Sequence, residues 1–387
     1  MSELLNGRWA ETKEALLEGL QGTKKSVMGV TLENTRKYLM ESPTSGATSA
    51  GNVATLNRVI LPVIRRVMPT VIANELVGVQ PMTGPVGQIH TLRVRYADSS
   101  SGQSVVAGEE ALSPFKIAEG YSGNESTGKA TSTATLEGAA GKRMSIQILK
   151  QTVEAKTRKL SARWTFEAAQ DAQAQQGIDI EAEVMAALAQ EITAEIDQEI
   201  LASLASLAGS AVETFDQNAV SGTATFVGDE HAALAVQINR VANLIAQRTR
   251  RGAGNWAVVS PFALTILQSA TTSAFARTTE GTFEAPTNTK FVGTLNNAMK
   301  IYVNTYATDN TDVLIGYKGS SESDAAAFYC PYIPLMSSGV VLDPSTFEPV
   351  VSFMTRYGYV ELSNTASSLG NAADYLGKVS LANVSFK

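Results

Sequence analysis

Few side chains in this sequence could carry out catalysis or hold a metal ion. The chain has two histidines, His90 and His231, and one cysteine, Cys330, all far apart in sequence. Structural and catalytic zinc sites take three or four ligands from such residues at short spacings. A single cysteine also excludes an internal disulfide, and no histidine can be assigned to it as a base. We therefore expect no metal site and no cofactor.

The glycine-containing run RRGAGN at 250–255 is the nearest approach to a nucleotide-binding motif. It lacks the GK[ST] ending of a phosphate-binding loop and the spacing of a dinucleotide fingerprint, so a tight turn fits it better. The GxSxG motif of a serine nucleophile does not occur in the chain. These observations predict a protein that is not an enzyme.

Charged residues are segregated into two consecutive blocks. Residues 142–163 contain seven Lys or Arg and one acid, whereas the thirteen Asp and Glu between Arg163 and Arg240 are interrupted by neither Lys nor Arg. Blocks of opposite sign suggest mutual contact, within a subunit or between subunits, although two solvated faces would give the same pattern. We predict that three bases face three acids: Lys156, Arg158 and Lys159 against Glu191, Glu195 and Glu199.

The acidic block lies on the longest predicted helix, residues 179–208, which contains no Gly or Pro. Its apolar residues recur every four positions: Val184, Leu188, Ile192, Ile196, Ile200 and Leu204. A four-residue step overshoots the 3.6-residue turn by about 40°, so the apolar stripe winds and its two ends should pack against different partners. Acids fill the other side (Glu183, Glu191, Glu195, Asp197 and Glu199), and Gly209 should end the helix. Two readings remain: an amphipathic core helix, or a strut between separate sheets.

The other segments mix helices and strands, which predicts an α+β protein. Residues 1–41 form a charged helical segment, 42–52 a polar loop, and 53–77 a helix broken by Pro62 and Pro69. A strand is expected at 88–96, before a Ser/Gly-rich excursion at 97–141. Short helices and strands then alternate up to residue 300. The tail is rich in strands (300–306, 313–319, 326–336 and 349–362).

Overall composition restricts the class of protein. The 387-residue chain has a net charge of −6, which gives no electrostatic support for a nucleic-acid-binding module. Only 18% of residues are charged, which indicates large surfaces buried against other protein. The sequence contains no run of about 20 apolar residues and no signal peptide, so we expect no contact with a membrane and a cytosol-like compartment.

Several blocks resemble the major capsid protein of T-even-type tailed bacteriophages. The most distinctive are RRVMP at 65–69 followed by GVQPM and GP within 78–85, VEAKTRKLSARWTFEAAQDAQAQQGID at 153–179 and RTRRGAGNWAVVSP at 248–261. The match continues at 313–336 and 350–360. This resemblance implies an HK97-like fold with an N-terminal arm, an extended loop, a spine helix and peripheral and axial domains.

The resemblance also implies a division of the chain. Residues 1–41 correspond to a propeptide, 42–96 to the N-terminal arm and first strand, and 97–141 to the extended loop lying over a neighbouring subunit. Residues 142–208 correspond to the peripheral domain with its spine helix, 209–300 to the axial domain, and 301–387 to a β-rich return. Larger family members insert a domain near the extended loop, for which 97–141 is too short.

The resemblance implies that the chain assembles with itself into the hexamers of an icosahedral or prolate DNA-filled head, and it leaves open whether the same chain also forms the pentamers. Its partners would be a scaffold protein, a prohead protease and a portal protein, with packaged DNA contacted only non-specifically. It would reside in the virion after assembly in the host cytoplasm. The alternatives are the paralogous vertex protein of the same fold and an encapsulin-like shell that sequesters cargo.

Cleavage of the N-terminal segment is implied as well, after a hydrophobic-x-Glu motif. Two such motifs precede the first family-like block: Leu16-Leu17-Glu18 and Leu39-Met40-Glu41. The first lies within the amphipathic stretch, whereas the second leads into Ser42-Pro43, where proline favours an extended, accessible chain. We predict cleavage between Glu41 and Ser42. The alternative is an ordered N-terminal helix that stays in the particle.

Overall fold

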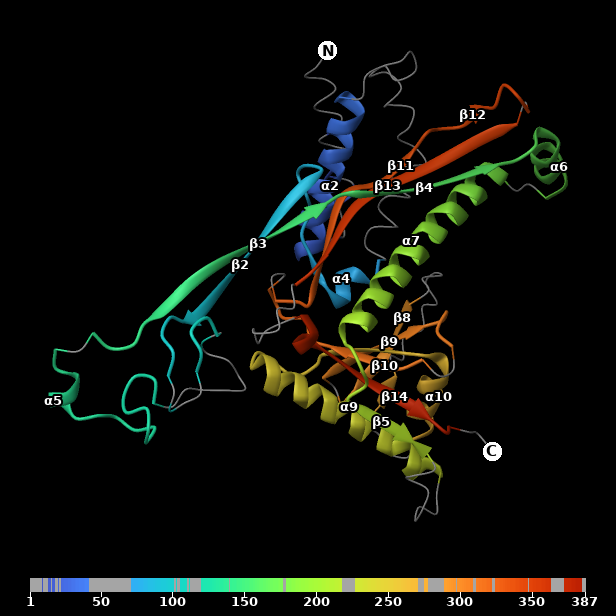
Figure 1. Ribbon diagram of the computed structural model, residues 1–387. Helices are drawn as coiled ribbons and strands as arrows, with labels where there is room; N and C mark the ends of the chain where they lie inside the picture. The colour runs from blue at the N-terminus through green and yellow to red at the C-terminus, as the bar shows by residue number, and fades with distance from the viewer. Residues whose placement is uncertain are drawn as a thin grey trace.

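The computed structural model is a mixed α and β structure in which one long helix runs between two sheets (Figure 1). A two-stranded hairpin projects far from this body. The structure describes residues 9, 13–14, 16–17, 20, 22–41, 71–100, 102, 105–109, 111, 120–138, 140–176, 179–217, 227–270, 275–277, 289–296, 298–308, 311–321, 324–346, 348–362 and 372–384. The predicted α+β class is confirmed.

The five-stranded sheet is built around β13 (Pro349–Glu361). On one side β13 pairs with β11 (Ala327–Ser337) and β12 (Val341–Leu342), and on the other with β4 (Lys156–Arg163). The two-residue strand β1 (Gly78–Val79) adds to β11 in parallel. Alternate residues of β13 are buried, because one face of the sheet lies against the long helix: Val351, Phe353, Thr355 and Tyr357.

The seven-stranded sheet is buried on both faces. Its strands, in spatial order, are β5 (Glu213–Asp216), β14 (Leu376–Ala382), β10 (Val313–Gly316), β6 (Trp256–Val259), β9 (Met299–Asn304), β8 (Thr289–Leu295) and β7 (Phe275–Arg277). Helices α9 (Val227–Thr249) and α10 (Pro261–Ser269) cover the face that carries Ala257 and Val259, whereas Trp256 and Val258 point into the core that contains the long helix. Gly316 is required beside Trp256, since an added Cβ would lie 2.1 Å from the indole ring.

The long helix, α7 (Ile180–Leu207), joins the two sheets. Asp179 caps it by accepting a hydrogen bond from the Glu181 N–H at 3.1 Å, and Gly209 follows its end at φ +68°. Its apolar residues share one core with Phe353 of the five-stranded sheet and Leu314 of the seven-stranded sheet. The predicted strut between separate sheets is therefore the arrangement that the structure shows (Figure 1).

The projecting hairpin pairs β2 (Val86–Tyr96) with β3 (Met144–Glu154) along their full length. The projecting segment therefore begins and ends about ten residues outside the 97–141 boundaries that composition predicts. The sequence does not reveal this, because the alternating residues of β2 and β3 are equally typical of strands within a larger sheet. Its tip contains the one-turn helix α5 (Thr133–Leu136) and a small local core, in which the rings of Tyr96 and Tyr121 lie 4.6 Å apart.

The remaining described elements are α2 (Gly22–Glu41), α4 (Ala73–Leu76), α6 (Phe166–Gln176) and the 3₁₀ turn η1 (Ala372–Tyr375). Most of the helix predicted at 53–77, up to residue 70, lies outside the described residues. Strand β14 was not predicted. In the described part of the chain, no helix has both the length and the apolar composition needed to cross a bilayer.

We expect Ile192→Pro to abolish folding of the body. Ile192 is 2% exposed in the middle of α7, and a proline there removes a helical hydrogen bond at a cost of about 3 kcal/mol or more. Ile192→Val is the control, because it keeps the helix and costs only about 1 kcal/mol. Chemical unfolding followed by circular dichroism measures both. A proline variant as stable as the valine variant would contradict the role of α7 as the joint between the sheets.

Candidate functional site

Arg158 of β4 forms the centre of a polar cluster between α7 and the five-stranded sheet. Its guanidinium donates to Glu195 at 2.7 Å and to Glu199 at 2.5 Å, one turn apart on α7. Its Nε also donates to the hydroxyl of Tyr357 on β13, at 2.6 Å. The Tyr357 hydroxyl in turn donates to Glu199. Three elements far apart in sequence are therefore linked through one forked side chain.

The charged groups of this cluster shift one another's pKa values toward their ionised forms. Burial acts to raise the pKa of Glu199, but the hydrogen bonds from Arg158 and Tyr357 and the charges of Arg158 and Lys156 hold it below its ordinary value. Burial acts to lower the pKa of Arg158, yet its contacts with Glu199 and Tyr357 raise it. Burial and the negative charge of Glu199 raise the pKa of Tyr357. The charged forms of Arg158 and Glu199 are thus stabilised together.

The other residues of the predicted charge contact lie apart from this cluster. Lys156 and Arg158 share one face of β4, and Lys156 acts on Glu199 only through its charge. Lys159 lies on the opposite face of the strand, because side chains alternate. Glu191 is exposed on α7, and no ion pair within the described residues includes it. The structure therefore brings together Arg158, Glu195 and Glu199 out of the six.

Asp197 of α7 is the acidic residue whose environment the sequence misassigned. The pattern placed it on the polar side of α7, but its side chain is 1% exposed. One carboxylate oxygen accepts the backbone N–H of Ile72, just before α4, at 2.9 Å. The other oxygen is buried and has no hydrogen-bond partner among the described residues. Burial raises the pKa of Asp197 to about 7, and the Ile72 N–H opposes this only in part.

Residues around Asp197 become buried because the segment entering α4 covers a side of the helix that neither sheet covers. Val71 and Ile72 belong to the same core as Ile196 and Ile200. This long-range packing has no signal in the sequence of α7 itself. In the sequence, Asp197 follows the apolar residue Ile196 just as the exposed acids of α7 stand beside apolar residues. Only the structure shows that Asp197 is buried and that the others are exposed.

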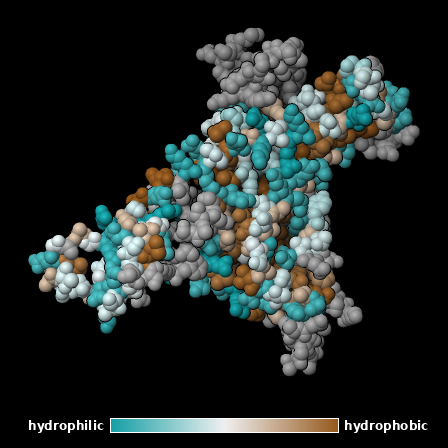
Figure 2. All heavy atoms as spheres, viewed as in Figure 1, coloured by the Kyte–Doolittle hydropathy of each residue, from teal (hydrophilic) through white to brown (hydrophobic). Residues whose placement is uncertain are grey.

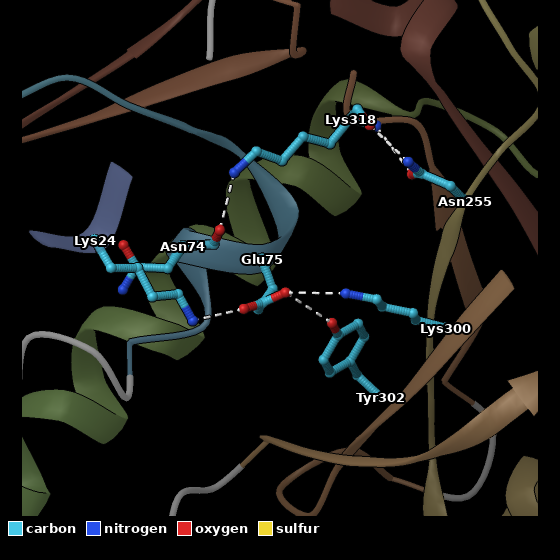
Figure 3. A network of polar contacts seen from close by, with 7 residues as sticks. All are labelled: Lys24, Asn74, Glu75, Asn255, Lys300, Tyr302 and Lys318. Atoms are coloured by element: carbon cyan, nitrogen blue, oxygen red, sulfur yellow. Dashed lines mark hydrogen bonds and ion pairs between the residues drawn. The ribbon is translucent and has the colours of Figure 1, made fainter. Parts of the chain in front are cut away.

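Glu75 of α4 joins the N-terminal helix to the seven-stranded sheet (Figure 3). Its carboxylate accepts from Lys24 of α2 at 2.8 Å, and from Lys300 and Tyr302 of β9 at 3.4 and 3.3 Å. Beside it, Lys318 donates to the carbonyl of Asn74 at 2.8 Å. Burial acts to raise the pKa of Glu75, but the two lysines lower it. Glu75 is therefore ionised at neutral pH and bridges the two elements.

Helix α2 is attached to the five-stranded sheet as well. The side-chain amide of Asn34 donates to the carbonyl oxygens of Met82 and Tyr332, at 2.6 and 3.1 Å. Three apolar residues of α2 enter the main core: Val27, Met28 and Leu32. The N-terminal segment thus contacts both sheets.

The predicted cleavage motif lies at the end of this helix. Leu39, Met40 and Glu41 form the last turn of α2, and Leu16 and Leu17 of the rival motif are helical too. Helix α2 therefore continues to the motif's last residue, and the extended chain is predicted only for the residues that follow Glu41. Ser42, on the far side of the predicted bond, lies outside the described residues.

The described residues offer little for catalysis. Within them, no group of three or more His, Cys, Asp or Glu is arranged to hold a metal ion. His90 is exposed on the hairpin, whereas His231 is buried in α9. Burial raises the pKa of the Cys330 thiol to about 11, so the reactive thiolate is suppressed. The polar clusters above join structural elements to one another.

Comparison with known proteins identifies relatives over most of the chain. The family model for the major capsid protein Gp23 matches residues 53–381. The major capsid protein of Vibrio phage KVP40 is 30% identical over 417 aligned residues, covering 84% of this chain and 80% of that protein. That of Enterobacteria phage T6 is 30% identical over 404 residues, covering 81% and 79%. A structure of the mature capsid of bacteriophage PhiM1 is similar at a TM-score of 0.47 and 11% identity, covering 80% and 86%.

We expect stability to fall as pH rises because of Asp197. Its pKa is about 7 when folded and about 3.9 when unfolded, so folding takes up a proton between those values. Stability is therefore lost as pH rises from about 4 through 7, by an amount on the order of 4 kcal/mol, and then levels off. Asp197→Asn should remove this component, whereas exposed Glu191→Gln should keep the wild-type profile. Urea unfolding from pH 5 to 8 checks this, and parallel profiles for wild type and Asp197→Asn would contradict it.

Proposed function

The chain belongs to the family of the major capsid protein Gp23 and is a structural protein of the head of a tailed phage, and from this premise we propose how its surfaces serve assembly. We propose that copies associate into hexamers, and into pentamers where the shell closes, with the hairpin of one copy lying on its neighbour. The match to major capsid proteins favours this role over a cargo shell or a separate vertex protein. The work of such a subunit is mechanical, through contacts with other copies.

The observation that carries this proposal is the apolar face of the hairpin. Met144, Ile146 and Ile148 alternate along β3 on one face and are 53%, 68% and 61% exposed. Figure 2 shows hydrophobic side chains on this projecting arm. The described part of the chain does not cover them, because the hairpin extends away from the body (Figure 1).

An isolated two-stranded ribbon is marginally stable in water and gains stability when one face is covered. The register places Ile146 opposite Val94, so the two strands contribute apolar side chains to the same face. Burying three such side chains contributes roughly 1.5–3 kcal/mol each when burial is complete. A neighbouring copy supplies that cover in a closed shell, which explains why the hairpin is long and why its exposed face is apolar.

Assembly requires further partners, which follow from the family and are part of the proposal. They are a scaffold protein that guides the growing shell, a portal protein at one vertex and a protease that acts before DNA is packaged. Assembly takes place in the host cytoplasm. DNA contacts are non-specific, which suits a chain with a net charge of −6.

The N-terminal segment 1–41 is proposed to be removed during maturation, with cleavage between Glu41 and Ser42. What supports a conformational role for this step is the position of α2, which contacts both sheets through Glu75 and Asn34. Its loss would release both attachments at once. Residues 42–76 would then remain as the N-terminal arm, 142–208 as the peripheral domain and 209–300 as the axial domain, and the β-rich return at 301–387 would complete both domains.

We expect Ile146→Glu combined with Ile148→Glu to give a folded chain that forms no shells. Both side chains are exposed, so the free energy of unfolding should change by about 0.5 kcal/mol or less. The same residues changed to Val are the control and should assemble. Electron microscopy and analytical ultracentrifugation after co-expression with the scaffold measure the outcome. Normal shells from the Glu variant would overturn the proposed role of the hairpin.

Intact-mass measurement on infectious virions tests the cleavage. The expected product begins at Ser42. Because α2 extends to Glu41, the last turn of the helix must unwind in the protease, and Met40→Pro should change the cleavage rate more than Met40→Leu does. A virion protein that still begins at Met1 or Ser2 would contradict the proposal.

A further inference from the structure

The far end of the five-stranded sheet carries a second uncovered surface, on the face opposite α7. Register across the strands places Arg163 beside Val350 and Val341, and Lys159 beside Met354 and Met336. Val341, which shares this face with Val350, is 57% exposed. Figure 2 shows hydrophobic spheres at this end, over β12. We call this apolar surface with its two bases the outer face.

The basic edge of the outer face restricts what can bind there. In the described part of the chain, β4 pairs only with β13, so its other edge is open. Open edges invite pairing with another strand, but Lys159 and Arg163 would repel a second β4 laid against it. Arg163 contacts Glu348 only at 3.8 Å, and its side chain is 67% exposed. The outer face therefore suits an apolar partner with acidic side chains.

Helix α6 has this composition and is itself exposed. Phe166 begins the helix and is 44% exposed, and Glu167 and Asp171 lie one turn apart, both exposed. No Lys or Arg occurs between residues 164 and 239, and the nearest base along the chain is Arg163, four residues before Glu167. Within the described residues, no ion pair includes Glu167 or Asp171. In its own subunit α6 contacts α7 and lies beyond the end of β4 (Figure 1).

We propose that α6 of one copy docks on the outer face of a second copy, with Glu167 and Asp171 facing Lys159 and Arg163. Phe166 then contacts the exposed apolar residues of β12. This inference rests on the proposed assembly function and names a subunit contact other than the hairpin. Apolar burial holds the contact together, whereas the charges set its register and exclude edge pairing between two β4 strands.

A charge-swap experiment tests the pairing. One variant carries Lys159→Glu and Arg163→Glu, and the other carries Glu167→Lys and Asp171→Lys. Each alone should raise the concentration needed for assembly about tenfold or more, because like charges then face one another at every such contact. Mixed one to one, the two variants should assemble together, since half of the contacts can pair opposite charges. The control Lys159→Arg with Arg163→Lys keeps both charges and should assemble as wild type does.

Cross-linking tests the contact without altering its charge. Ser161 lies between the two bases on β4 and Gln170 lies on α6, and both are exposed. Within assembled shells, a short bis-maleimide should link Ser161→Cys chains to Gln170→Cys chains in a mixture, but should link neither variant to itself. The buried Cys330 should not react.

The outcomes separate this inference from the proposed function. If the wild-type chain forms no shells with its scaffold, the proposed function itself fails. If wild type assembles and both charge-reversed variants assemble equally well, or if the mixture recovers neither assembly nor the cross-link, docking of α6 on the outer face is overturned while the shell function stands.

Discussion

The structure depends on the burial of one winding apolar stripe, on α7. Because a four-residue repeat drifts around a helix, residues from Val184 to Leu204 cannot all face one sheet. They are buried only when the two sheets approach α7 from different directions and the segment entering α4 covers a third side. Fixing α7 therefore fixes the relation between the sheets. Apolar packing determines how α7 and the two sheets are arranged. The polar contacts of Arg158, Asp197 and Glu75 lie at the edges of this core and add hydrogen bonds between the same elements.

These polar contacts differ in what they contribute. The ion pairs of Arg158 are partly exposed, and such pairs stabilise a fold by only about 0–1 kcal/mol each. Their main effect is to orient β4 relative to α7. Asp197 is buried and half satisfied, which costs stability whenever it is ionised. Glu75 connects α2 to β9, so an N-terminal segment that belongs to no sheet is nonetheless attached to the body. The hairpin and the outer face are the opposite case, because within the described residues both expose apolar side chains, which we propose other copies of the chain to bury.

Sequence reasoning succeeded where local pattern determines structure. The bounds of α7 and the glycine after its end follow from propensity and periodicity, and strand β2 follows from alternation. It failed where distant segments decide the environment. Asp197 fits the polar side of α7 by spacing, yet Ile72, 125 positions earlier, buries it. Arg158 and Lys159 are equivalent as charges, and only the direction of β4 sends one toward α7 and the other to the outer face. Strand β14 and the extent of the hairpin depend on pairing partners that composition does not reveal.

Native-state hydrogen exchange of the unassembled chain tests most directly whether α7 joins the two sheets into one unit. Amides of α7 near Leu188 and near Leu204 should open with the same free energy and the same denaturant dependence as those of β13 and β6, because neither sheet can lose the helix without exposing the shared core. If the amides near Leu188 open together with β13 while those near Leu204 stay closed with β6, the sheets are separate units and α7 is not the joint between them.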